Sequence, residues 1–229
     1  RLPWMEAPLP PPGQSSSLSR RQAVLDAGVA AARGLRQAED GDEVGVWLLT
    51  FINHWNLEQE RFVLLCQKTM LRVKYNFLAQ RVEKSTRISL SELESLTLGR
   101  VRFASQSLAE GLQTLSRGAA IARPGVRMTF RGEELKQWER WNPRSKKMGQ
   151  RRIIFCSHVD SGDGAPLIDP LEKVEKFQDA LQHTLAALEG VNVQPVVSDI
   201  VLDSMLGLPA LVYNENRLGE WRTRGSIAF

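Results

Sequence analysis

The chain has 229 residues and a formal net charge of +4, with 42% hydrophobic and 24% charged residues. This composition is ordinary for a globular protein, and the length allows one well-buried core. No apolar run approaches the roughly 20 residues that cross a bilayer, so we do not expect an integral membrane protein.

The first 38 residues divide into a tail and a helix. Residues 1–18 are rich in proline and serine, which predicts a disordered tail. Residues 19–38 contain alanines and scattered apolar residues, which predict a helix that packs on the sheet, although Gly28 and Gly34 each cost about 1 kcal/mol relative to alanine. The acidic stretch 39–43 then predicts a turn.

From residue 44 the hydrophobic period changes to two, the period of β-strands. Leu71, Val73 and Tyr75, for example, alternate with polar residues, which predicts an antiparallel meander with one buried face. Seven short strands are expected, at residues 44–52, 60–67, 71–77, 87–90, 96–103, 126–131 and 152–158.

A second helix is indicated after the strands by apolar residues at spacings of three and four. We expect Asp169 as its N-cap, Pro170 as its first residue and Gly190 after its last turn. Its apolar stripe consists of Leu171, Val174, Phe177, Leu181, Leu185 and Leu188.

These elements predict an α+β fold that is mostly antiparallel β. At residues 44–190 we expect a pleckstrin-homology-like bent sheet or partial barrel, closed by the second helix. A β-sandwich is the alternative, but it would leave the helix stripe with no place to bury. Residues 191–229 are predicted to form an extension that packs on the domain, with a strand near 196–202.

One stretch has the spacing of a catalytic motif in the wrong structural context. Residues 66–72 show the C-x5-R spacing of phosphate-binding loops in cysteine phosphatases. Such a loop opens into a helix N-terminus, whereas this stretch lies between two strand patterns and is typical of a hairpin turn. Ser157, His158 and Asp160 are neighbours in sequence without a nucleophile elbow, and no nucleotide-binding glycine loop occurs. We therefore expect no enzyme.

The two cysteines lie in apolar runs, where free cysteine usually serves as a small buried hydrophobe, which favours a reduced cytoplasmic setting. Two thiols cannot build a disulfide framework or a four-thiolate zinc site, and the three histidines show no ligand spacing. We expect no metal and no cofactor.

Positive charge is concentrated between residues 100 and 152, where 13 Lys and Arg face 4 Asp and Glu. Such a basic stretch with tryptophans can contact an anionic membrane, single-stranded nucleic acid or an acidic peptide, although most such stretches are solvated loops. We retain peripheral contact with an anionic membrane as the alternative function and expect no nucleic acid partner. The candidate basic surface consists of Lys136, Arg144, Lys146, Lys147, Arg151 and Arg152.

The turn between the first two predicted strands is aromatic and acidic. Phosphoinositide headgroups are usually gripped by cations in this turn of pleckstrin-like domains, whereas here it carries Glu58 and Glu60, which disfavours that lipid mode. Two roles remain open for this turn, a structural clasp of the hairpin or a protein-binding surface, and we favour the clasp.

The same hairpin resembles the TPRG/TPRGL (Mover) family. The family pattern is similar to G-x-W-L-L-T-x-x-D-H-W-N-x-E-x-E-R, and this chain matches it with Asn53 in place of the aspartate. Further matches are KYNF at 74–77, RISL at 87–90, RWNP at 140–143 and TRGSIAF at 223–229. Arg144 replaces a family tryptophan, so partner contacts made there are not carried over. The candidate partner-binding or structural residues are Trp47, His54, Trp55, Asn56, Glu58, Glu60, Arg61, Arg140, Trp141, Asn142 and Pro143.

The resemblance implies a Sac-two homology domain of the inositol phosphatase F type, itself non-catalytic and pleckstrin-like. It also implies a cytoplasmic adaptor that is associated with vesicles, presynaptic in Mover-type members. The partners implied by the resemblance are a second copy of the chain, calmodulin, and vesicle or active-zone scaffolds.

Overall fold

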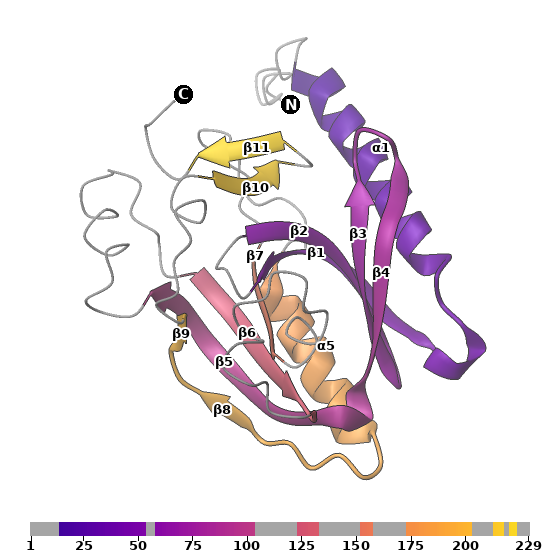
Figure 1. Cartoon of the computed structure of the whole chain (residues 1–229). Coiled ribbons are helices and arrows are strands. Elements are labelled where there is room, and N and C mark those ends of the chain that lie inside the picture. The colour runs from indigo at the N-terminus through magenta and orange to yellow at the C-terminus, as the bar shows by residue number, and fades with distance from the viewer. Residues whose placement is uncertain are drawn as a thin grey trace, which may run out of the picture.

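The computed structural model describes residues 14–53, 58–103, 123–132, 152–157, 173–202, 213–217 and 220–223 (Figure 1). Its helices are α1 (Gln14–Arg33) and α5 (Val174–Ala187), with short 3-10 turns at Ala38–Asp40 and Leu90–Glu92. Its strands are β1 (Glu43–Ile52), β2 (Glu58–Cys66), β3 (Thr69–Asn76), β4 (Arg81–Ser89), β5 (Leu93–Phe103), β6 (Arg123–Phe130), β7 (Arg152–Ser157), β8 (Pro195–Val197), β9 (Ile200–Leu202), β10 (Tyr213–Arg217) and β11 (Glu220–Thr223).

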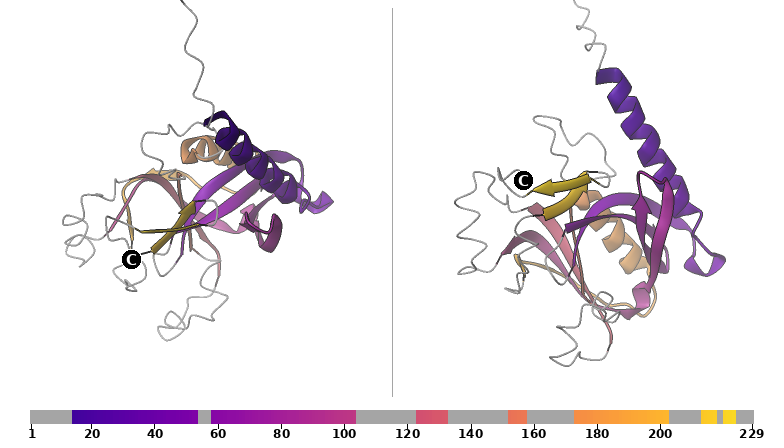
Figure 2. Two further views of the ribbon diagram at one scale, coloured as in Figure 1. Left: turned by 90° about the horizontal axis from the view of Figure 1, so that it is seen from above. Right: turned by 45° about the horizontal axis from the view of Figure 1, so that its top comes forward.

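The first seven strands form a bent antiparallel sheet in the order β4-β3-β2-β1-β7-β6-β5. Two meanders, β1 to β4 and β5 to β7, therefore meet where β1 pairs with β7. Helix α5 lies across the inner side of the bend (Figures 1 and 2). This arrangement confirms the predicted fold class, a pleckstrin-homology-like sheet closed by one C-terminal helix.

The inner core lies between α5 and the bent sheet. The helix buries Val174, Phe177, Leu181 and Leu185 there, which confirms the predicted stripe over the described part of the helix. Burying each of these side chains contributes roughly 1.5–3 kcal/mol. The strands contribute Trp47, Leu49, Phe51, Val63, Leu65, Met70, Ile88, Leu93, Leu96, Val126, Met128, Phe130, Ile153 and Phe155.

A second apolar layer covers the outer face of the first meander, where the sequence predicted only one buried face. Helix α1 buries Leu25, Val29 and Ala32 against that face, which confirms its expected packing on the sheet. The strand residues beneath it are Val46, Leu48, Phe62, Leu64, Cys66, Leu71, Val73, Tyr75 and Phe77. Both faces of β1 and β2 are thus covered, which explains why these strands are continuous apolar runs without alternation.

Several boundaries differ from the predicted ones. Helix α1 spans Gln14–Arg33 rather than 19–38, because the serines before residue 19 continue it and the chain tightens into 3-10-type bonds after Gly34. The predicted N-cap of α5 at Asp169 is wrong, because α5 begins at Val174 and its N-cap residue is Lys173, in an extended conformation. Residues 158–172 lie outside the described part. The cap comes from another element, because Ser157 Oγ accepts a 3.2 Å hydrogen bond from the Val174 amide.

The extension after α5 adds strands to the far edge of the sheet. The strand predicted near 196–202 is divided into β8 and β9, which run parallel to β5. The backbone between them lies against Gly99 of β5, where an added Cβ would lie 1.9 Å from the Ser198 carbonyl oxygen. Ile200 and Leu202 are buried with Ile52, Ile154 and Cys156 in a third apolar cluster. No helix within the described ranges is long and apolar enough to cross a membrane.

Candidate functional site

The first hairpin, which carries most of the candidate residues, has buried rather than exposed acidic side chains. Glu58 and Glu60 open β2, and each is 5% exposed. A Glu58 carboxylate oxygen lies 2.5 Å from a guanidinium nitrogen of Arg123, at the start of β6. The same guanidinium donates a weak 3.5 Å hydrogen bond to the Ser157 carbonyl of β7. A buried carboxylate needs such a partner, so Glu58 joins the hairpin to the second meander.

Arg61 braces the strand on which it lies. Its guanidinium donates hydrogen bonds to the Glu60 carbonyl at 2.6 Å and to Gln59 Oε1 at 2.5 Å. Both acceptors belong to the two residues that precede it in β2. The described part of the hairpin is therefore held by contacts within the fold, and the clasp interpretation of the whole turn stays a prediction. His54, Trp55 and Asn56 lie outside the described residues, and their role as a protein-binding surface stays a prediction.

Trp47 is a core residue that the G-x-W pattern makes room for. It is 8% exposed, and its ring centroid lies 5.4 Å from that of Phe177 in an edge-to-face arrangement. A Cβ on Gly45 would lie 2.5 Å from the Trp47 ring, so glycine at this position lets the indole fold back over the strand. The contact between Trp47 and Phe177 thus helps to hold α5 on the sheet.

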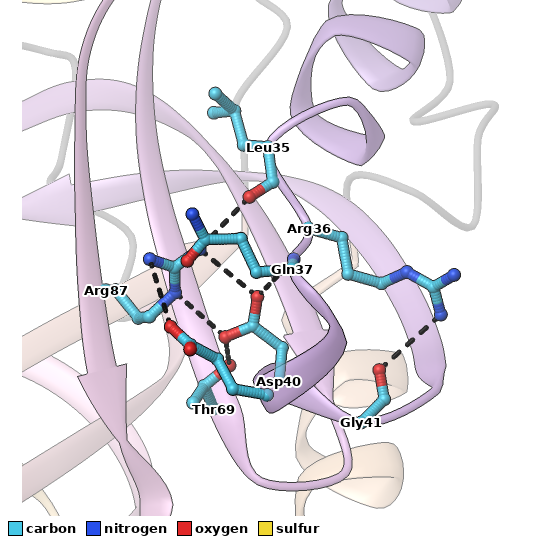
Figure 3. Close-up of polar contacts among 8 residues, drawn as sticks. Leu35, Arg36, Gln37, Asp40, Gly41, Thr69 and Arg87 are labelled. Atoms are coloured by element: carbon cyan, nitrogen blue, oxygen red, sulfur yellow. Dashed lines mark hydrogen bonds and ion pairs between the residues drawn. The ribbon is translucent and has the colours of Figure 1, made fainter.

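A polar cluster around Asp40, which sequence reasoning missed, joins the α1–β1 connection to the edge of the first meander (Figure 3). The Asp40 carboxylate is fully buried and accepts hydrogen bonds from Thr69 Oγ1 at 2.6 Å, the Gln37 amide at 2.7 Å and Arg87 Nε at 2.8 Å. Arg87 also donates to the Leu35 carbonyl at 3.1 Å. Burial alone would raise the pKa of Asp40, but these hydrogen bonds together hold it below its usual value.

We call Asp40, Thr69 and Arg87 the Asp40 clamp. It holds the end of the α1 segment against β3 and β4 and so keeps α1 on the outer face of the sheet. Arg87 begins the RISL stretch noted in the sequence, which carried no role there. No local pattern links Asp40 to Arg87, because 47 positions separate them.

The C-x5-R stretch is a hairpin turn, as the sequence predicted. Cys66 ends β2 and is buried under α1 on the outer face, where burial and then the charge of Asp40 raise its pKa to about 11. Arg72 lies on the opposite face, its guanidinium 4.3 Å from the centroid of the Phe51 ring. The thiol and the guanidinium therefore point to opposite sides of the sheet and cannot hold one phosphate, and a thiol with this pKa is protonated at neutral pH.

The described part of the basic block is largely engaged within the fold. Besides Arg123, which pairs with Glu58, Arg102 lies 3.0 Å from Asp199 and Arg127 donates a 3.3 Å hydrogen bond to Thr97. Arg152 is half-buried where β7 begins, opposite Thr129 of β6. The other predicted residues lie outside the described ranges, so their surface stays a prediction; they are Lys136, Arg140, Trp141, Asn142, Pro143, Arg144, Lys146, Lys147 and Arg151.

Across the residues whose placement is described, no three His, Cys, Asp or Glu side chains are grouped closely enough to hold a metal ion. The buried carboxylates of Glu58 and Asp40 are instead bound to arginines.

The chain is similar to a known family model and to a known human protein. The family model hSac2, described as inositol phosphatase, matches residues 16–122. The human tumor protein p63-regulated gene 1 protein is 27% identical over 218 residues, which cover 91% of this chain and 75% of that protein.

Among solved structures, the hSac2 domain from human phosphoinositide phosphatase Sac2 gives a TM-score of 0.44 at 15% identity, covering 85% of this chain and 93% of the domain. A structure of Vav1 with an allosteric inhibitor gives a TM-score of 0.36 at 10% identity, covering 77% of this chain and 34% of that one.

Proposed function

We propose that this chain, which carries an hSac2 domain and is homologous to the human tumor protein p63-regulated gene 1 protein, is a non-enzymatic adaptor that acts by binding other proteins. In this proposal the pleckstrin-like sheet is a rigid scaffold, and its edges and turns contact the partners. The chain works in the cytoplasm, at the surface of vesicles. Its partners are scaffold proteins and a second copy of itself.

The observation that carries the proposal is how the fold uses its reactive side chains. Cys66, the candidate nucleophile of the C-x5-R stretch, is buried with a pKa of about 11 and faces away from Arg72. The carboxylates of Asp40 and Glu58 are buried and bound to arginines. Groups held in this way stabilise a scaffold rather than perform acid–base or nucleophilic chemistry.

Calmodulin, the remaining partner implied by the resemblance, would need a segment other than the described part of α1. An amphipathic target helix offers its apolar face to calmodulin. In α1 that face, with Leu25, Val29 and Ala32, is already buried on the sheet. Binding by α1 would require the helix to leave the sheet and expose the apolar residues beneath it.

Proximity labelling in cells, with the full chain fused to a biotin ligase, tests the proposal. We expect a reproducible set of labelled proteins that the ligase alone does not label. The double variant Trp55→Ala, Asn56→Ala should lose part of this set while keeping the circular dichroism spectrum of the parent chain. A set identical to that of the ligase alone would contradict the proposal.

Two further assays distinguish the competing functions. Flotation with anionic liposomes at low and high salt tests the alternative function at the membrane, because electrostatic binding falls as salt rises. Salt-sensitive flotation without any protein neighbours would favour that alternative. Release of phosphate from phosphoinositides that disappears in Cys66→Ser would instead show an enzyme.

A further inference from the structure

The described sheet has edges at β4, β8 and β11, and the first two of these differ in chemistry. The β4 edge carries the exposed charged residues Arg81, Glu83 and Lys84, which guard an edge against pairing with another chain. At the other end the sheet closes with β8 and β9, and residues 190–198 contain no charged side chain. Val196 is 57% exposed and Val197 is 82% exposed. The β8 part of this edge therefore lacks the charges that prevent strand addition.

The β8 edge is held firmly in place. The Ser198 amide donates a 2.9 Å hydrogen bond to the Leu98 carbonyl of β5. On the C-terminal side, Asp199 lies 3.0 Å from Arg102, and Ile200 is completely buried. The exposed valines are thus fixed by anchored neighbours, and a partner would lose little entropy in ordering them.

The direction of the backbone shows what this edge offers. Successive residues of a strand point their N–H and C=O groups to opposite sides. Because Ser198 points its amide toward β5, Val197 points its N–H and C=O away from β5. Its side chain, which stands roughly perpendicular to the sheet, is exposed as well. Pro195, two residues earlier, has no N–H to offer and is typical of an edge strand. Val197 is therefore the residue at which a further strand would pair.

We propose that the β8 edge binds an extended, uncharged segment of a partner protein as an added β-strand. This inference rests on the proposed adaptor function and names its binding site. Val197 exchanges backbone hydrogen bonds with the added strand, and the side chains of Val196 and Val197 pack against its aliphatic residues. Strand β8 has three residues, 195–197, which span about 10 Å at about 3.3 Å per residue, so the added strand pairs with this edge over about three to four residues.

Selection of peptides on the full chain tests this site. The probe is a displayed library of random seven-residue peptides, and the affinities of selected peptides are then measured by fluorescence polarisation. We expect uncharged peptides with aliphatic residues at two or more successive positions, because Val196 and Val197 point to opposite faces of the sheet. Selection of only charged or proline-rich peptides would overturn the proposal.

Three variants locate the binding. Val197→Pro removes the outward N–H without touching the Ser198 bond to β5, and should weaken the selected peptides about tenfold, the effect of one lost backbone hydrogen bond. Val197→Thr keeps the N–H and the branched side chain and should bind within about threefold of the parent chain. Leu78→Lys, at an 85% exposed residue of the β3–β4 turn, should leave affinity unchanged. Equal binding by Val197→Pro and the parent chain would refute the site.

Two outcomes separate this inference from the function on which it rests. If Val197→Pro labels the same cellular proteins as the parent chain, the edge is not their binding site, while the adaptor function stands. If the parent chain has no specific protein neighbours, the adaptor function itself fails. If Val197→Lys converts a dimer to a monomer in sedimentation while no peptide binds, the edge belongs to a second copy and the proposed partner is wrong.

Discussion

Replacing Asp40 by alanine should destabilise the chain by loosening α1. In the parent chain the buried carboxylate accepts hydrogen bonds from Thr69, the Gln37 amide and Arg87. The variant leaves a buried hydroxyl and a backbone amide without that acceptor, and it leaves Arg87 without its closest anion. The damage should concentrate at the α1–β1 connection, because all these groups surround it (Figure 3).

The size of the effect follows from burial. Removing one partner of a buried ion pair costs about 3–5 kcal/mol. The Arg87 side chain is 33% exposed and keeps its bond to the Leu35 carbonyl, so water and that carbonyl offset part of the loss. We therefore expect the free energy of unfolding of Asp40→Ala to fall by about 2–3 kcal/mol.

Urea unfolding followed by circular dichroism measures this change, and hydrogen exchange locates it. The amides of residues 22–33 in α1 should lose more protection than those of α5. Asp42→Ala is the matched control, because Asp42 is 85% exposed and lies 3.8 Å from Arg36; its stability should stay within about 0.5 kcal/mol of the parent chain. A loss below about 0.5 kcal/mol in Asp40→Ala, or exchange that rises equally in α5, would refute the role of the clamp.

Three further predictions follow from the same core. Because the pKa of Asp40 is lower in the folded chain than in the unfolded chain, its carboxylate stabilises the fold at any pH above the pKa of the unfolded chain. This contribution should disappear as pH falls below about 4. Asp40→Asn should lack this part of the pH dependence when melts of the two chains are compared. Gly28→Ala should lower the free energy of unfolding by about 1 kcal/mol, because the new Cβ would lie 2.3 Å from the buried Phe62 ring, and this clash outweighs the better helix propensity of alanine. Gly34→Ala is the control: the nearest atom to its Cβ is 3.5 Å away, so this variant should be neutral or stabilising. Cys66 should resist iodoacetamide at pH 8 until the chain is unfolded, and mass spectrometry that finds it alkylated within minutes in the native chain would contradict its burial.

The sequence predicted those elements whose signal is local. The alternation along β3 and the stripe of α5 each repeat within one element, and both lie where the pattern placed them. The one-sided burial expected of the meander was wrong, because it depends on where a separate helix, α1, packs. The α5 N-cap was wrong for a similar reason, since its acceptor is Ser157, 17 residues before Val174 and on another element.

The candidate site was predictable in outline only. Glu58 and Glu60 stood out as acidic residues in a hairpin turn, and the clasp interpretation of Glu58 depends on Arg123, which is 65 positions away in the printed sequence. The Asp40 clamp had no signal at all, because an aspartate in an acidic turn is ordinary until its neighbours in space are known. These residues differ from those of an ordinary surface turn because they are buried, and their burial depends on how the whole sheet is assembled.

Both broad faces of the first meander are covered, and this coverage bears on where an adaptor of this kind can bind. Helix α5 fills the inner face and α1 the outer one, so neither face of β1 or β2 is open to a partner while the helices remain in place. In the described part of the chain, strands β4, β8 and β11 then form the edges of the sheet. The charges of β4 disfavour strand pairing, whereas Val197 on β8 offers an anchored and uncharged edge. In the proposed function, recognition therefore falls to the edge of the sheet rather than to its faces.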